Sequence, residues 1–100
     1  MAITDCNRKP KIMKLTETLV VKNEMGLHAR PATEIVKLLQ NCQSEVTFIL
    51  GLMKINAKTI LGILMLAAPK NAAITVLIEG SDAIETMNKL KYAFEGKFGE

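Results

Sequence analysis

Apolar and polar residues alternate in several short segments, which is the pattern of half-buried strands. Leu15–Lys22 is rich in Thr, Leu and Val and is predicted as the first strand. Glu45–Leu50 alternates strictly, and Gly51 separates it from Met53–Asn56, so these two segments predict a hairpin. Ile74–Glu79 alternates again and is predicted as the fourth strand.

Two longer segments carry apolar residues at helical spacing. The first begins at Ala29, and Pro31 falls in its first turn, where a missing N–H group costs little. The second follows Asp82, which together with Glu85 has the spacing of a capping box. Gly96 comes after its last apolar residue and is predicted as its C-cap.

The segment Ile60–Leu66 is apolar almost throughout, so periodicity alone does not distinguish a helix from a strand. Thr59 before it can serve as an N-cap and Pro69 after it is a stop signal, which favours a short helix. About half of this helix must pack on the sheet, but not every side chain can face inward. We expect an exposed apolar surface formed by Ile60, Leu61 and Leu64.

The predicted element order is β-α-β-β-α-β-α, with three helices on one face of a four-stranded sheet. This is an α+β fold, a two-layer open-faced sandwich. A chain of 100 residues predicts a single domain, and its hydrophobic share of 49% suffices for a core without disulfides or metals. Residues 14–100 are the predicted domain; residues 1–13 are polar, basic and without period, and predict a disordered extension.

The net charge of +3 invites a nucleic-acid-binding interpretation, but its distribution argues against one. Residues 1–14 hold four basic residues and one acidic residue, whereas residues 15–100 hold nine of each. A nucleic-acid-binding domain needs a basic face that follows the phosphates. The predicted domain is neutral, so we expect no nucleic-acid partner.

The composition indicates a cytoplasmic protein. Cys6 and Cys42 are the only cysteines, and we expect both to be unpaired, reduced thiols. No segment has the apolar core of a secretory signal. The longest apolar run, Ile60–Ala68, is shorter than the about 20 residues that a membrane-spanning helix needs, so no membrane insertion is expected.

The only histidine of the chain, His28, lies where the predicted loop meets the first helix. Backbone N–H groups and the positive end of the helix dipole are directed to this position. A neutral imidazole there has a nitrogen lone pair that can act as a nucleophile. Once phosphorylated, the ring would find its phosphoryl oxygens stabilised by these N–H groups and by Arg30.

A lone histidine near a helix start is more often a capping or surface residue. The chain has no second histidine, cysteine pair or carboxylate cluster around it, so metal-binding and hydrolase sites lack their components. We expect no metal and no cofactor.

The run Gly26–Ala32, Gly-Leu-His-Ala-Arg-Pro-Ala, resembles the phosphorylation-site signature of the histidine-containing phosphocarrier (HPr) family of the bacterial phosphoenolpyruvate-dependent phosphotransferase system. The run Asn56–Leu66 resembles the second signature of that family. The similarity extends over roughly residues 15–99, and the element order matches the family's HPr-like fold, an antiparallel sheet of strand order 1-4-2-3 covered by three helices.

The resemblance implies a role for each of these residues. Nδ1 of His28 would accept a phosphoryl group from enzyme I and pass it to a IIA protein or domain, and Arg30 would neutralise the phosphate. Thr59 stands in the place of a regulatory serine that an HPr kinase/phosphorylase modifies. The docking surface for these partners would comprise Leu27, Ile60, Leu61 and Leu64. The protein would be a monomeric carrier rather than an enzyme.

Three features depart from the common pattern of the family. Thr59 replaces serine, Met25 stands where many sugar-branch members have a small polar residue, and the N-terminal extension is longer than usual. Met25 and the run Leu64–Leu66 resemble the nitrogen-branch relatives, called NPr. The alternative interpretation is therefore a nitrogen-branch regulatory phosphocarrier, or a regulatory binding module that is not coupled to sugar uptake.

Overall fold

The computed structural model describes residues 13–99 of the chain. Its elements, in chain order, are β1 (Met13–Val20), α1 (Ala29–Leu39), β2 (Glu45–Leu50), β3 (Met53–Asn56), α2 (Ile60–Leu66), β4 (Ala73–Gly80), α3 (Ala83–Glu95) and the 3₁₀ turn η2 (Lys97–Gly99). All the predicted elements are present. The sequence did not predict η2.

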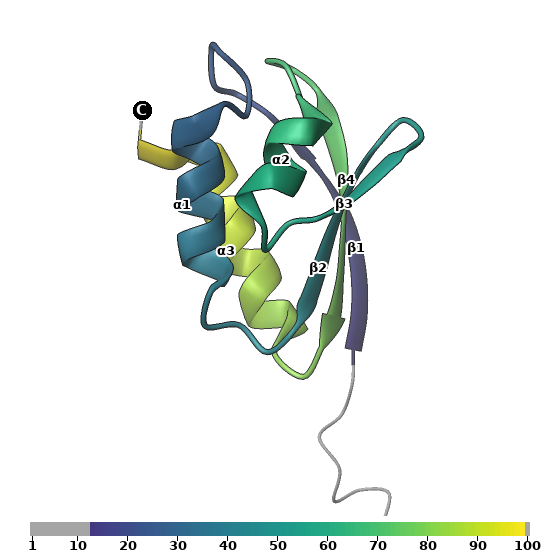
Figure 1. Ribbon diagram of the computed structural model, residues 1–100. Coiled ribbons are helices and arrows are strands. Elements are labelled where there is room, and N and C mark those ends of the chain that lie inside the picture. Colours follow the sequence, from purple (N-terminus) through teal and green to yellow (C-terminus); the bar gives the residue numbers. More distant parts are fainter. Residues whose placement is uncertain (1–12, 100) are drawn as a thin grey trace, which may run out of the picture.

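The four strands form one antiparallel sheet in the order β1-β4-β2-β3. The three helices lie together on one face of it, and the other face is left uncovered (Figure 1). Neighbouring strands are held in register, so that Thr16, Leu77, Thr47 and Asn56 form one row across the sheet. The predicted two-layer open-faced sandwich is confirmed.

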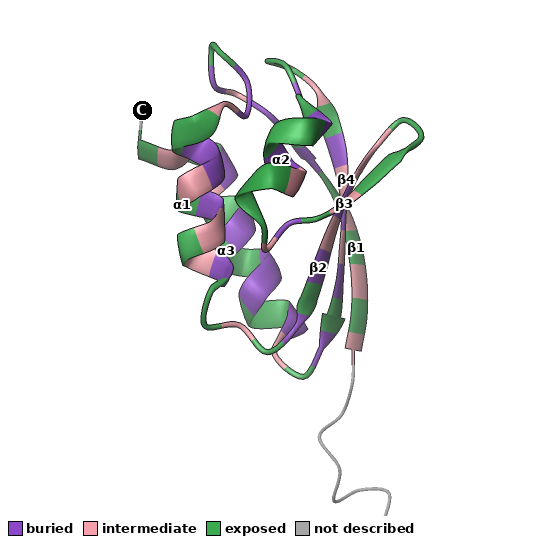
Figure 2. Cartoon of the chain, in the orientation of Figure 1, coloured by how far each residue is buried: buried purple, intermediate pink, exposed green. Residues whose placement is uncertain are grey.

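The core lies between the sheet and the helices, where buried residues line the facing sides of both layers (Figure 2). In β4 the alternation predicted from the sequence is seen directly, because Ile74, Val76 and Ile78 are fully buried. Phe48 of β2 meets Phe94 of α3 edge to face, with ring centroids 6.1 Å apart. This contact fastens α3 to the centre of the sheet.

The first strand begins and ends two residues earlier than the predicted Leu15–Lys22. Met13 pairs with Gly80, so the last residue of the expected extension is part of the sheet. The rest of that extension, residues 1–12, lies outside the described residues. At the other end, Val21 leaves the ladder but still exchanges backbone hydrogen bonds with Asn71 and Ala72.

The capping box predicted at Asp82 is wrong. Asp82 is the N-cap residue of α3, but its side chain makes no capping hydrogen bond. Its carboxylate instead accepts hydrogen bonds from the amides of Gln43 and Ser44, at 2.9 and 3.0 Å, and from the Ser44 hydroxyl. The hydrogen bond from the Ser44 hydroxyl, followed by the one from the Gln43 amide, lowers the pKa of Asp82. The carboxylate thus ties α3 to the loop before β2.

Candidate functional site

His28 is the N-cap residue of α1. Its backbone is extended, with φ −85° and ψ −166°, and its carbonyl oxygen accepts the first helical hydrogen bond from the Ala32 amide at 3.0 Å. The side chain makes no capping hydrogen bond, and the ring is partly exposed. The prediction that His28 lies at the N-terminus of the first helix is therefore confirmed.

The first turn of α1 presents backbone donors at the helix end where His28 is the N-cap residue. The amides of Ala29 and Arg30 have no acceptor within the helix, since the first N–H groups of any helix lack one. Pro31 is buried and contributes no donor. The partial positive charge of the dipole is concentrated at this end of α1, which favours a phosphoryl group there.

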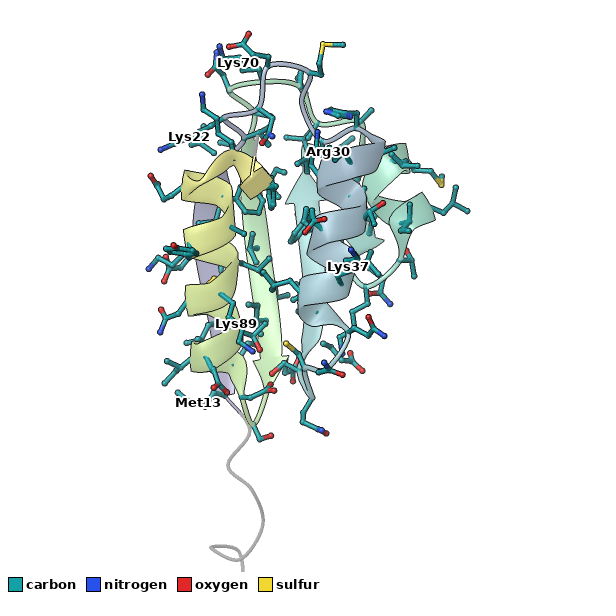
Figure 3. All side chains as sticks on the ribbon, turned by 90° about the vertical axis from the view of Figure 1, so that its left-hand side faces the viewer. Met13, Lys22, Arg30, Lys37, Lys70 and Lys89 are labelled. Carbon is teal, nitrogen blue, oxygen red and sulfur yellow. The ribbon has the colours of Figure 1, made fainter. Side chains whose placement is uncertain are left out.

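Arg30 is exposed at the same end of α1, as Figure 3 shows by its label near the top of that helix. Among the residues that the structure describes, no carboxylate forms an ion pair with its guanidinium. Two lysines near this end are paired, because Lys22 contacts Glu95 at 2.7 Å and Lys70 contacts Glu24 at 2.6 Å. Arg30 is a cation of the first turn of α1 that remains available to an incoming anion, and Lys97 of η2 is a second exposed cation.

The loop before His28 is fastened to the connection between α2 and β4. The Leu27 amide donates to the Ala68 carbonyl at 2.9 Å, and the Gly26 amide donates to the Asn23 carbonyl at 3.0 Å. Gly26 has φ +74°, and a Cβ atom at this residue would overlap the Ala68 carbonyl oxygen. Only glycine fits both the backbone conformation and the close approach.

An ion pair adds to this attachment. The Lys70 ammonium donates a hydrogen bond to the Glu24 carboxylate, and this bond together with the charge of Lys70 lowers the pKa of Glu24. Because both side chains are largely exposed, we assign the pair little stabilising effect of its own. It nevertheless joins the same two segments that the Leu27 backbone bond joins.

Thr59 is the N-cap residue of α2, as predicted. Its Oγ1 accepts a hydrogen bond from the Gly62 amide at 3.1 Å, and its hydroxyl donates to the Asn56 carbonyl, also at 3.1 Å. The residue is exposed at the surface. The hydroxyl is thus engaged in the cap of α2, at a residue that is exposed at the surface.

An exposed apolar surface lies on α2 and the neighbouring loop. We call it the α2 patch, and it consists of Met25, Ile60, Leu61, Leu64 and Met65. Leu61 is 69% exposed and Met25 78% exposed, whereas Ile63 and Leu66 of the same helix are buried. The prediction that Ile60, Leu61 and Leu64 are exposed is confirmed. Met65 was not among the residues predicted to be exposed, although its spacing of four residues from Leu61 places both on one helix face.

The α2 patch reaches His28 through a groove of about 320 Å³, lined among others by Met25, Leu64 and Pro69. Leu27 had been expected on the exposed docking surface, but its side chain is only 3% exposed and belongs to the core cluster. The bond from its amide to Ala68 turns this residue inward. Leu27 therefore lines the groove from the core side and is not part of the patch.

Neither a metal-binding cluster nor a membrane-spanning helix is found within the described residues. Within residues 13–99, no group of three or more His, Cys, Asp and Glu side chains could hold a metal ion. None of the helices in that range is long and apolar enough to cross a membrane.

The sheet, its three helices and the N-cap histidine of α1 define a small open-faced sandwich domain with a histidine at a helix start. The model of the family described as the PTS HPr component phosphorylation site matches residues 15–96. The chain therefore belongs to the HPr phosphocarrier family of the phosphotransferase system.

Individual relatives agree with this assignment. The phosphocarrier protein HPr of Chlamydia pneumoniae is 41% identical over 90% of this chain and 83% of its own length. The crystal structure of HPr from Thermoanaerobacter tengcongensis is 35% identical, covers 86% of this chain and 97% of its own, and has a TM-score of 0.82. The structure of Crh, described as a catabolite repression protein of Bacillus subtilis that forms an intertwined dimer, is 31% identical over 77% of this chain and 88% of its own, with a TM-score of 0.67.

Proposed function

We propose that this phosphocarrier accepts a phosphoryl group on Nδ1 of His28 from the phosphohistidine of enzyme I and passes it to a IIA protein or domain. The observation that carries the proposal is the position of His28 as N-cap of α1 beside the unpaired Arg30. In each transfer one N–P bond breaks and one forms, so the protein is both product and substrate of its partners and not an enzyme. It needs no cofactor and no metal.

The positive charges at the start of α1 support phosphoryl transfer at His28. A phosphoryl group on His28 would meet the amides and the dipole of α1, and the guanidinium of Arg30 would add charge-assisted hydrogen bonds. These contacts stabilise the negative charge that the three equatorial oxygens of the phosphoryl group share during its transfer. Arg30 is thus proposed to bind the phosphate, while His28 forms the covalent bond.

The α2 patch is proposed to be the surface on which enzyme I and IIA dock. Ile60, Leu61 and Leu64 are exposed apolar residues beside a reactive group, which is the arrangement expected of a protein-binding site. A Leu61→Asp variant should weaken binding of enzyme I by at least about tenfold with little loss of thermal stability. Ile84→Asp is the matched control, because Ile84 is similarly exposed but lies on α3.

Thr59 is proposed to be a conditional phosphorylation site for an HPr kinase/phosphorylase. Phosphate at the start of α2 would be tolerated by the helix, because it meets the positive end of the dipole. It would also place a doubly charged group inside an otherwise apolar contact surface, which partners would have to desolvate. Modification is therefore expected to block docking without unfolding the domain.

The central experiment is incubation of the purified chain with enzyme I and labelled phosphoenolpyruvate. The chain should acquire label in a bond that is acid-labile and sensitive to hydroxylamine, as expected of a phosphoramidate. A His28→Ala variant should acquire none. Label retained by that variant would refute the assignment of the acceptor.

A second candidate function is a regulatory phosphocarrier of the nitrogen branch or a binding module outside sugar uptake. The resemblance to Crh, which is described as a catabolite repression protein, supports a regulatory role. The presence of both His28 and Arg30 favours the carrier. Transfer from the phosphorylated chain to sugar-branch and nitrogen-branch IIA proteins, compared side by side, would separate the two branches.

We further propose that the protein acts in the cytoplasm as a monomer, without nucleic acid or membrane insertion. The neutral charge of residues 15–100 argues against a nucleic-acid partner, and the proposed transfer partners place the protein in the cytoplasm. Sedimentation of the full chain would distinguish a monomer from an intertwined dimer of the kind described for Crh.

A further inference from the structure

The C-terminal turn η2 lies beside the end of α1 that follows His28, although the two are far apart in the sequence (Figure 1). Phe98 in this turn packs edge to face on Phe94, with ring centroids 5.0 Å apart. Phe94 in turn contacts Phe48 in the centre of the sheet. The turn is therefore attached to the core through a chain of three aromatic rings.

The backbone of η2 adopts a conformation that its residues rarely take. Lys97 and Phe98 have φ values of 55° and 54°, so two successive residues other than glycine are left-handed. Such conformations persist only where the surrounding structure enforces them, and they concentrate at functional sites. In η2 the aromatic packing of Phe98 supplies part of that enforcement, and a hydrogen bond from Asn23 to the carbonyl of Lys97 supplies another part.

Asn23 connects this turn to the loop that carries His28. Its side chain is fully buried, and its Nδ2 donates to the Lys97 carbonyl at 2.8 Å. Its own carbonyl accepts the bond from the Gly26 amide that closes the turn before Leu27. The loop is thus held on one side by η2, through Asn23, and on the other by the carbonyl of Ala68.

We propose that η2 is a support for the phosphoryl-acceptor loop, and that Asn23 and Phe98 are positioning residues for His28. The inference rests on the proposed function, since it concerns transfer at the same histidine. Neither residue touches the phosphoryl group. They act by fixing the turn that sets where the His28 ring stands relative to the amides of α1 and to Arg30.

The test measures the initial rate of transfer from phosphorylated enzyme I as a function of the concentration of the full chain. Asn23→Ala removes the bond to η2, and Phe98→Ala removes the aromatic packing that holds η2. Each should lower the maximal rate by about ten- to a hundredfold, because small displacements of a reacting group have effects of this size. The KM should stay unchanged, because the α2 patch is intact.

Matched controls are Asn88→Ala and Ile84→Ala, at two exposed residues of α3, the helix that precedes η2. Both should show the kinetics of the unchanged chain. Thermal melts of every variant accompany the kinetics. The half-life of the isolated phosphohistidine, measured without a partner, provides a second readout of the loop, and it should change in the Asn23 and Phe98 variants only.

The outcomes separate this inference from the proposed function. If the unchanged chain accepts no phosphate, the proposed function fails. If it does and the folded variants transfer at the normal maximal rate, or show only a raised KM, the positioning role is refuted. If Asn23→Ala does not fold, Phe98→Ala decides the matter. If neither folds, η2 supports the whole domain rather than the loop, which also refutes the inference.

Discussion

Helices α1 and α2 begin in opposite ways. In α2 the N-cap residue, Thr59, closes its own first turn, because its hydroxyl oxygen accepts the Gly62 amide. In α1 the N-cap residue is His28, whose side chain makes no capping bond. Both residues have an extended backbone, so the difference lies in the side chain and not in the geometry of the chain.

The difference shows how one domain can contain both a helix start that is open to a ligand and a helix start that is closed by its own cap. Thr59 satisfies one donor of α2 internally and stabilises that helix. His28 leaves the first amides of α1 for a ligand, and the loop is held instead by hydrogen bonds from other residues, to the carbonyls of Ala68 and Lys97. Stability at α1 is thus supplied by neighbouring segments, whereas at α2 it is supplied by the cap itself.

The largest effect on this comparison is expected from Gly26→Ala, which changes the loop that precedes α1. The left-handed backbone and the overlap with the Ala68 carbonyl should together lower the free energy of unfolding by about 2–5 kcal/mol. Denaturant unfolding measures the loss. Gly51→Ala is the control, because Gly51 has φ +62° but nothing within 4 Å of an added Cβ, and only the backbone strain remains. Equal losses for both would show that the loop tolerates the overlap.

Arg30→Ala tests whether the open start of α1 binds phosphate. The variant should fold normally but accept phosphate about ten- to a hundredfold more slowly, which corresponds to the loss of one charged hydrogen bond in the transition state. Lys37→Ala, at the other end of the same exposed helix face, should transfer at the normal rate. Normal transfer by the Arg30 variant would leave the amides of α1 as the sole phosphate ligands.

Thr59→Ala tests the closed start of α2. Loss of the cap should lower the free energy of unfolding by about 1 kcal/mol, while the rate of phosphate acceptance at His28 stays unchanged. Thr59→Ser keeps the hydroxyl and should melt close to the unchanged chain. Thr59→Asp, a partial mimic of phosphothreonine, should also melt near the unchanged temperature yet accept phosphate more slowly. If protein that is stoichiometrically phosphorylated at Thr59 accepts phosphate on His28 at the normal rate, Thr59 acts only as a helix cap.

The smallest effect is expected at the start of α3, where the contribution of Asp82 to thermal stability depends on pH. The pKa of Asp82 is lowered in the folded state, below its ordinary value of 3.8, chiefly by the Ser44 hydroxyl. The stabilisation is therefore complete above the unfolded pKa and is lost as the pH falls through the folded one. Between about pH 5 and pH 3 the melting temperature should fall more for the unchanged chain than for Asp82→Asn. Parallel curves would show that the carboxylate contributes nothing in its charged form.

Much of the fold could be predicted because the local patterns agree with it. Alternation in Ile74–Glu79 reflects a sheet with one buried face, and helical spacing after Ala29 reflects a helix with one buried stripe. Thr59 could be assigned as a cap because its bond is made to a residue only three positions away. His28 could also be placed at a helix start, because the signals for the loop before it and for the helix after it lie in neighbouring residues.

What the sequence did not decide involves contacts between residues that are distant along the chain. Asp82 has the spacing of a capping residue, yet its carboxylate is engaged by Gln43 and Ser44, about forty positions earlier. Local spacing cannot show which of two acceptable partners a side chain takes. The choice is made when α3 packs against the loop before β2.

The sequence by itself thus determined the order of the elements, the cap of α2 and the histidine at the start of α1, because short-range hydrogen bonds and periodic burial suffice for these. Only the tertiary structure decided that Leu27 is buried rather than exposed, and that Asn23 meets the carbonyl of Lys97 across the fold. Both outcomes follow from packing the loop before α1 between two other segments. That packing has no signature in the loop's own residues, because it depends on the shape of the surfaces that enclose it.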